Sequence, residues 1–131
     1  MQLTEPGAVH LDTHVVCWLY AGMVHLLSDA ATRALEQSEL RVSPWVVLEL
    51  ERWHERGLLT LGADAILLDL SRRVGVTVAK VDAEVAFRAA CAVNWTDDVF
   101  DRGIVAHATL SEAPLVTKDA KIHAHFSQAL W

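Results

Sequence analysis

The sequence contains little cysteine and no long apolar run. Its two cysteines, Cys17 and Cys91, are the only ones among 131 residues, and neither has the CxxC or Cys/His spacing of a zinc site. Their apolar surroundings favour buried free thiols over a disulfide or a zinc site. The chain does not open on a basic stretch followed by an apolar run, and no segment approaches the roughly 18 apolar residues of a membrane span. We therefore expect a soluble, cytoplasmic protein with no signal peptide and no membrane contact.

Positive charge is also scarce. The chain has 11 Lys and Arg residues against 17 Asp and Glu residues, which gives a formal net charge of −6. High affinity for nucleic acid normally depends on a broad basic surface that neutralises phosphates, and this composition argues against one. A nucleic-acid substrate would therefore need help from a metal ion or a local basic patch. A basic protein partner would be attracted to the acidic surface.

Internal repeats, low-complexity tracts and long linkers rich in Gly, Ser or Pro are absent as well. A chain of 131 residues matches one domain that buries about two thirds of its unfolded surface. We expect residues 1–131 to form a single domain.

The sequence does contain apolar segments that alternate between strand-like and helical patterns. Pro44 suits the first turn of a helix, Gly22 and Gly57 mark helix ends, and Asp82 is a typical N-cap. This alternation predicts an α/β fold with a mainly parallel sheet, in which ligands bind beyond the carboxyl ends of the strands. Strands are expected over 8–11, 40–43, 76–81 and 114–117, helices over 15–22, 28–38, 44–57, 61–75, 82–93 and 100–113, and a short helix or turn with an apolar tail over 120–131.

Five acidic residues fall where such a fold would bring them to one edge of its sheet. Asp12 and Asp119 directly follow strands, and Glu49 lies in the second turn of the helix after another strand. Asp98 and Asp101 are three positions apart where a helix begins. Converging carboxylates repel one another and raise one another's pKa, so the cluster is stable mainly when a cation occupies it. Oxygen ligands select Mg²⁺ or Mn²⁺, and such sites catalyse phosphodiester hydrolysis.

Simpler explanations exist for some of these acids. Capping and the helix dipole explain Asp98 or Asp101 as well as a metal site does, and Asp97 is best explained as a cap or a solvated loop residue. Asp12 is different, because an acid at the end of an apolar strand must be paired or solvated, and this favours a functional role.

Two further patterns leave alternatives open or argue against a site. One of Glu49 and Glu51 is expected to face solvent, and periodicity does not say which. His123 and His125 are two positions apart, so on a helix they would face apart, and no third ligand completes a histidine metal site.

Four stretches carry a family resemblance: LDTHVVCWLY, RVSPWVVLELERWHERGLL, DDVFDRGIVAHA and PLVTKDAKIHAH. In this order the chain resembles the PIN-domain ribonucleases, in particular the VapC-type toxins of bacterial and archaeal toxin–antitoxin pairs. The resemblance covers most of the chain. It implies a three-layer α/β/α PIN fold with a mainly parallel central sheet, and a Mg²⁺- or Mn²⁺-dependent endoribonuclease.

The resemblance also implies residue roles. Asp12, Glu49, Asp101 and Asp119 match the family's acidic quartet, with Asp12 and Asp101 as the surest metal ligands. Glu49 and Asp119 would complete the shell, directly or through water, and orient the attacking water. Asp98 matches the acid that often precedes the FDR triplet.

Two threonines take a secondary place in this interpretation. Thr13 and Thr117 would support the metal ligands or contact phosphate, although ordinary capping or turn hydroxyls explain them equally well. Arg102 would contact RNA phosphate or, equally, form an ion pair within the acidic site.

The chain departs from the family at three positions. Val99 replaces a usual proline, Gly103 replaces a bulky apolar residue, and His107 stands where Gln or Thr is more common. None of these changes removes an acid. A glycine inside a helix costs about 1 kcal/mol relative to alanine, so Gly103 indicates a close contact or local looseness.

The expected partners are an RNA substrate and a cognate antitoxin, with homodimers or hetero-oligomers that include the antitoxin. A non-catalytic PIN-like module that binds protein or RNA is the alternative, and the intact set of acids argues against it. A phosphotransfer domain fits poorly, since a phosphatase of that class would need an acid where this chain has His14.

Overall fold

The computed structural model describes residues 7–131. Residues 1–6, part of the N-terminal stretch in which no signal peptide is expected, lie outside the described residues. Its centre is one sheet of five parallel strands in the order β3-β2-β1-β4-β5. The strands are β1 (Ala8–Leu11), β2 (Glu39–Val42), β3 (Thr77–Val78), β4 (Leu115–Val116) and β5 (Ala129–Leu130). The helices are α1 (Thr13–Ala21), η1 (Val24–Leu26), α2 (Asp29–Gln37), α3 (Pro44–Glu55), α4 (Ala63–Val74), α5 (Ala83–Cys91), α6 (Val99–Leu110) and α7 (Ala120–His125).

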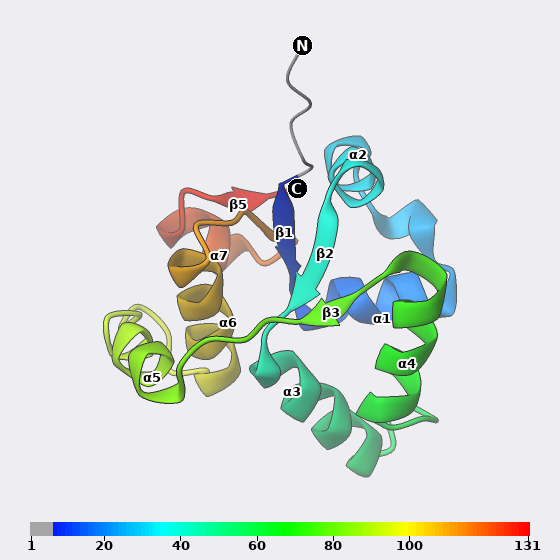
Figure 1. The fold of residues 1–131 in the computed structure, drawn as a ribbon, viewed down its shortest axis with the longest axis horizontal. Coiled ribbons are helices and arrows are strands. Elements are labelled where there is room, and N and C mark those ends of the chain that lie inside the picture. The colour runs from blue at the N-terminus through cyan, green and yellow to red at the C-terminus, as the bar shows by residue number, and fades with distance from the viewer. Residues whose placement is uncertain (1–6) are drawn as a thin grey trace.

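The helices cover the sheet on both sides, which confirms the predicted three-layer α/β/α fold with a parallel sheet. In Figure 1, α1, α2 and α4 lie on one side of the sheet and α5, α6 and α7 on the other, with α3 beyond the carboxyl ends of β1 and β2. A single cluster of buried apolar side chains fills the space between the layers, with Leu11, Leu50, Ile66, Ile104 and Leu115 among its fully buried members.

Local sequence signals explain where α1 and α3 begin and end. Asp12 caps α1, because its side chain accepts the Thr13 N–H, and the helix ends at Gly22, whose φ of 72° is a left-handed conformation that favours glycine. Pro44 opens α3 at the first turn, where its missing N–H costs nothing. These signals place Asp12 at the end of β1 and Glu49 in the second turn of α3, as the sequence predicts.

The structure differs from the predicted elements at the two sheet edges. The expected strand over 76–81 contains only two strand residues, and the expected apolar tail after α7 holds β5, which pairs with β4. Both edge strands are two residues long, so period-two alternation cannot reveal them. The short 3-10 helix η1 was also not predicted.

The close contact that Gly103 indicated lies between α6 and α3. A side chain at Gly103 would overlap the indole ring of Trp45, the second residue of α3. The same indole packs edge-to-face on Phe87 and Phe100, at ring-centre distances of 5.8 and 6.0 Å. This packing brings the helix that carries Glu49 against the helix that carries Asp101.

The cysteine prediction is half right. Both thiols are free, but only Cys17 is partly buried. Cys91, the last residue of α5, is exposed. Among the helices of residues 7–131, none has the length and apolar character needed to cross a membrane.

Candidate metal centre

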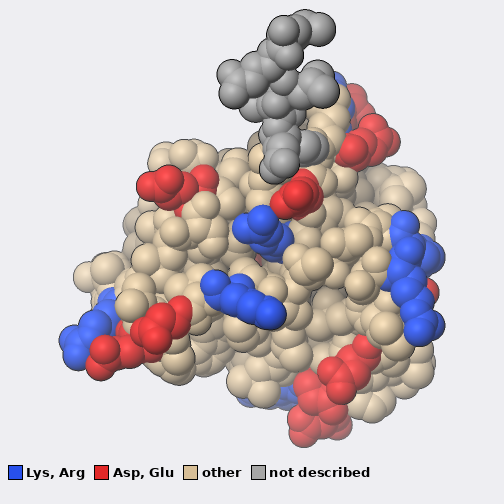
Figure 2. All heavy atoms as spheres, viewed as in Figure 1, with Lys and Arg blue, Asp and Glu red and all other residues tan. Residues whose placement is uncertain are grey.

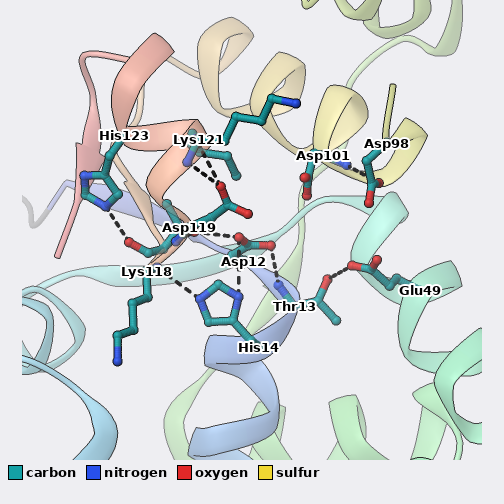
Figure 3. A network of polar contacts seen from close by, with 12 residues as sticks. Asp12, Thr13, His14, Glu49, Asp98, Asp101, Lys118, Asp119, Lys121 and His123 are labelled. Atoms are coloured by element: carbon teal, nitrogen blue, oxygen red, sulfur yellow. Dashed lines mark hydrogen bonds and ion pairs between the residues drawn. The ribbon is translucent and has the colours of Figure 1, made fainter. Parts of the chain in front are cut away.

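The carboxylates of five distant residues face one space at the carboxyl edge of the sheet. They come from the end of β1, from α3, from the start of α6 and from the turn after β4, and Figure 3 shows them around that space. The residues are Asp12, Glu49, Asp98, Asp101 and Asp119. All the candidate acids of the sequence are therefore brought together, although they are spread over more than a hundred positions of the chain.

Asp12 is the most constrained of these acids. Its side chain is 5% exposed, and both of its oxygens accept hydrogen bonds. Oδ1 accepts the backbone N–H of Thr13 at 2.8 Å, and Oδ2 accepts the hydroxyl of Thr117 at 2.6 Å. A buried carboxylate needs such donors, so the orientation of Asp12 is fixed by both β1 and β4.

Glu49 is the inward-facing member of the pair on α3. It is 9% exposed and accepts a short hydrogen bond from the hydroxyl of Thr13. Glu51 faces outward and accepts the backbone N–H of Ala63 at 3.0 Å, which satisfies a free donor at the start of α4. The choice that periodicity left open is thus settled by the packing of α3, whose buried face carries Val46, Glu49 and Leu50.

Asp98 and Asp119 serve as helix caps as well as members of the cluster. Asp98 Oδ1 accepts the N–H groups of Phe100 and Asp101 at 2.9 and 3.1 Å. Asp119 Oδ1 accepts the N–H groups of Lys121 and Ile122 at 2.8 and 3.0 Å. Each cap uses one carboxylate oxygen, so the second oxygen of each residue makes no protein hydrogen bond within residues 7–131.

The cluster perturbs the acid at its centre most strongly. Burial, together with the charges of Asp98, Asp12, Asp119 and Glu49, raises the pKa of Asp101 from its ordinary 3.8 to about 7. The pKa of Glu49 is also raised, first by burial and further by Asp12 and Asp98, and its bond to Thr13 only partly offsets this. A bound cation would offset both the burial of these charges and their mutual repulsion.

The residues present fit a hard divalent cation in ligand type. Their free ligand atoms are carboxylate oxygens, which Mg²⁺ and Mn²⁺ prefer, and no Lys or Arg of residues 7–131 forms an ion pair with them. Within residues 7–131, no three His, Cys, Asp or Glu side chains stand close enough together to hold one ion by themselves. The arrangement therefore suits an ion that keeps several of its waters and takes few direct protein ligands.

Both threonines predicted to support the ligands do contact them. The hydroxyl of Thr13 donates to Glu49, and that of Thr117 donates to Asp12 while accepting the N–H of Asp119 at 3.1 Å. A further neighbour was not predicted: His14 lies beside Asp12, with Nδ1 3.5 Å from Asp12 Oδ2. His14 is present in the HLDTHV stretch, but no rule of spacing links a histidine at this position to the acidic site.

Arg102 belongs to a different part of the structure from the one predicted. Its guanidinium donates to the backbone oxygens of Ala90 and Cys91, both at 3.3 Å, near the end of α5. It makes no ion pair with the acids of the cluster. Of the two alternatives for Arg102, the ion pair within the acidic site is therefore wrong, because the carbonyls at the helix end hold the side chain, while a phosphate contact stays a prediction.

The three departures from the family pattern lie around α6. Val99 is the first residue of the helix and 54% exposed, at a position where proline is equally suitable. Gly103 accommodates Trp45, as described above. His107 is buried on the same helix, and burial lowers its pKa, which keeps the ring neutral.

The two histidines near the chain end have separate partners. His123 Nε2 lies 2.6 Å from the backbone oxygen of Thr117, whereas His125 stacks on Trp95 at a ring-centre distance of 4.8 Å. The two rings face apart, as the sequence predicts.

The family model of the PIN domain matches residues 9–126, a span that includes all five acids. The chain belongs to the PIN-domain family. No curated protein is similar enough in sequence to be matched.

The PIN domain also shares its fold with a solved structure. A chain in the crystal structure of VapBC2 from Rickettsia felis, bound to a DNA fragment from their promoter, superimposes with a TM-score of 0.58. The alignment covers 89% of this chain and 92% of the other, at 16% sequence identity. At this identity the likeness establishes the common fold.

Proposed function

We propose that this PIN domain is a metal-dependent endoribonuclease that acts as the toxin of a toxin–antitoxin pair. The observation that carries the proposal is the convergence of five carboxylates from four separate elements on one space (Figure 3). Membership of the PIN family supports the nuclease, and the fold shared with a chain of VapBC2 supports the toxin.

Asp12, Glu49, Asp101 and Asp119 would hold Mg²⁺ or Mn²⁺, directly or through water. When bound, such an ion neutralises the scissile phosphate and lowers the pKa of a coordinated water. Glu49 and Asp119 orient the water that attacks phosphorus, and one P–O bond of the RNA backbone breaks.

The supporting residues act through these ligands. Thr117 and Thr13 hold the carboxylates of Asp12 and Glu49 in place through the hydroxyl bonds described above. Asp98 anchors the first turn of α6 and adds negative charge next to Asp101.

The partners follow from the same proposal. We propose an RNA substrate, a cognate antitoxin and a homodimer or a hetero-oligomer with the antitoxin, in the cytoplasm, with residues 1–131 as one PIN domain. The VapBC2 structure supports an antitoxin partner by analogy, because a chain of this fold is part of that complex.

One observation favours a second candidate, a non-catalytic PIN-like module that binds protein or RNA. No three acids of the described part of the chain stand at coordinating distance from one ion, and Asp101 is half protonated near neutral pH in the absence of metal. A module of this kind would keep the fold and the binding surface without cleavage.

The deciding experiment is RNA cleavage by purified protein. Transfer, ribosomal and messenger RNAs are incubated with Mg²⁺ or Mn²⁺, with a chelator control. We expect cleavage by the wild type, and none with chelator or with Asp12→Asn, whose charge is needed at the centre of the site. Asp97→Asn is the matched control, because Asp97 is an exposed acid of the neighbouring loop that lies outside the proposed set.

The outcomes separate the two candidates. Cleavage that persists in Asp12→Asn or in chelator would contradict the proposed mechanism. Binding of RNA or protein without cleavage of any RNA would favour the non-catalytic module.

A further inference from the structure

His14 connects two turns that carry proposed metal ligands. It lies in the first turn of α1, two residues after Asp12, and its Nε2 accepts the backbone N–H of Lys118 at 3.0 Å. Lys118 immediately precedes Asp119 in the turn between β4 and α7. The imidazole therefore bridges the turn after β1 and the turn after β4 (Figure 3).

The direction of this bond fixes the position of the ring proton. Because Nε2 accepts the Lys118 N–H, it carries no proton itself, and a neutral ring holds its proton on Nδ1. Nδ1 faces Asp12 Oδ2 at 3.5 Å, which is longer than a hydrogen bond but directs the positive end of the N–H at the carboxylate. One side of the ring thus contacts Asp12 and the other holds the turn before Asp119.

The ring itself is held by aromatic packing. Trp18, one turn further along α1, meets His14 edge-to-face at a ring-centre distance of 5.0 Å. Trp131, which follows β5, packs on Trp18 at 5.8 Å. His14 therefore has a defined orientation that depends on both α1 and the end of the chain.

The second side-chain link between the two turns is the hydroxyl of Thr117, which donates to Asp12 and accepts from Asp119 N–H. That link holds the start of the turn, whereas His14 holds Lys118. Two separate attachments on neighbouring residues restrict the rotation of the turn about either one.

We propose that His14 is a positioning residue that holds Asp119 in register with Asp12 and thereby sets the affinity of the site for its divalent cation. This inference rests on the proposed metal site. The bond to Lys118 carries the effect, because it acts on the backbone next to Asp119.

Two conservative variants separate the two contacts of the ring. An Asn amide reaches only as far as the position of Nδ1, so His14→Asn keeps a donor facing Asp12 and loses the bond to Lys118. A Gln side chain extends to the position of Nε2, and in His14→Gln its amide oxygen can accept the Lys118 N–H. His14→Ala removes both contacts.

The test measures Mn²⁺ binding to each purified full-length variant, by loss of the electron paramagnetic resonance signal of free Mn²⁺. Residues that orient metal ligands typically change metal affinity by about 10–100-fold, so we expect at least a tenfold loss for His14→Ala. His14→Asn should resemble His14→Ala, and His14→Gln should bind nearly as tightly as the wild type. His25→Ala, the same change at an exposed histidine of η1, should have no effect.

Thermal unfolding without metal separates positioning from a general loss of structure. We expect the melting temperatures of His14→Gln and His14→Asn to be close to each other while their Mn²⁺ affinities differ. RNA cleavage by His14→Ala should recover at saturating Mn²⁺.

Three results would overturn the inference. His14→Ala that binds Mn²⁺ as tightly as the wild type would refute it and leave the proposed metal site intact. His14→Asn that binds tightly while His14→Gln does not would show that the contact with Asp12, and not the bond to Lys118, matters. A wild type that binds no Mn²⁺ would refute the metal site and the inference together.

Discussion

Asp101 is the residue whose charge depends most on its surroundings. It lies at the start of α6, where burial and four other carboxylates act on it, and its pKa of about 7 means that it exchanges a proton near neutral pH. An acid in this condition destabilises the fold when it ionises, unless a cation compensates it. We therefore expect the clustered carboxylates to lower the stability of the metal-free protein and to favour binding of a cation.

A pH titration of the metal-free protein tests this directly. Between the ordinary pKa of 3.8 and about 7, the folded state holds a proton on Asp101 that the unfolded state has released. The free energy of unfolding contributed by Asp101 is therefore fully present below the lower pKa and falls as pH rises through this window. The buried histidines His10 and His107, whose pKa values are lowered, act in the opposite direction in both proteins, so the comparison is with Asp101→Asn. We expect the thermal stability of the wild type in chelator to fall relative to that of Asp101→Asn as pH rises through this window, and Mn²⁺ to remove this relative loss.

Asp97→Asn is the control for this titration, because Asp97 is exposed and four residues away. It should leave the pH dependence unchanged. An Asp101→Asn variant with the slope of the wild type would show that the repulsion described above does not act on the fold.

At the residue scale, sequence reasoning succeeds where a local rule applies. Asp12 is recognisable because an acid that ends an apolar strand needs partners, and it has them in Thr13 and Thr117. The choice of Glu49 over Glu51 needs the packing of α3, which no local rule supplies. The ion pair expected as one alternative for Arg102 is absent for a related reason: its partners are backbone carbonyls of another helix, which leave no pattern in side chains.

At the scale of elements, the site depends on how closely α3 approaches α6. The indole of Trp45, a side chain of α3, lies directly on Gly103, where α6 has no side chain of its own. This contact sets the separation of Glu49 on one helix and Asp101 on the other. A change at the contact should therefore affect both stability and metal affinity.

Gly103→Ala is the corresponding variant. The added methyl would overlap the Trp45 ring, and overpacking of this kind costs about 1–3 kcal/mol, while alanine regains about 1 kcal/mol of helix propensity. We expect a net loss in the free energy of unfolding, measured by urea denaturation, and weaker Mn²⁺ binding. In the double variant Trp45→Leu/Gly103→Ala, the losses of unfolding free energy from the two single changes should not add, because leucine at position 45 leaves room for the methyl group at position 103.

Gly7→Ala is the matched control, because among the described residues, chain neighbours aside, no atom lies within 4 Å of the position its methyl would take. It should change the free energy of unfolding by less than about 0.5 kcal/mol. A Gly103→Ala variant as stable as this control would show that the two helices move apart at no cost.

The elements themselves follow well from the sequence where they are long or carry caps. α3 and α4 have clear start and stop signals, and each lies within two residues of its expected bounds. β3 and β5 do not, because a strand of two residues is defined by the neighbour it pairs with and not by its own pattern. The sheet edges are thus a property of tertiary packing.

At the scale of the whole molecule, the excess of negative charge distinguishes this protein from proteins that bind RNA through a broad basic surface. Its net charge is −6, and three of its arginines form ion pairs with acids, Arg41 with Glu39, Arg73 with Asp69 and Arg88 with Glu84. On the face shown in Figure 2, Lys and Arg side chains lie singly or in small groups and form no continuous basic surface. Under the proposed function, RNA would therefore be held by few phosphate contacts together with the metal.

The salt dependence of RNA binding follows from this distribution of charge. For single strands, each phosphate contact contributes a slope of about −0.7 to log affinity against log salt, so two contacts lose about sevenfold between about 50 and 200 mM KCl, and six lose about 300-fold. We expect the smaller loss, measured by fluorescence anisotropy of a labelled RNA on the wild type in chelator, where we expect no cleavage. Arg52 lies over Phe100 and near enough to Glu49 to affect its pKa, so we expect it to contact phosphate and Arg52→Gln to make the slope shallower. Arg73→Gln, which removes an arginine already paired with Asp69, should not, and a loss near 300-fold would mean that a broad basic surface exists after all.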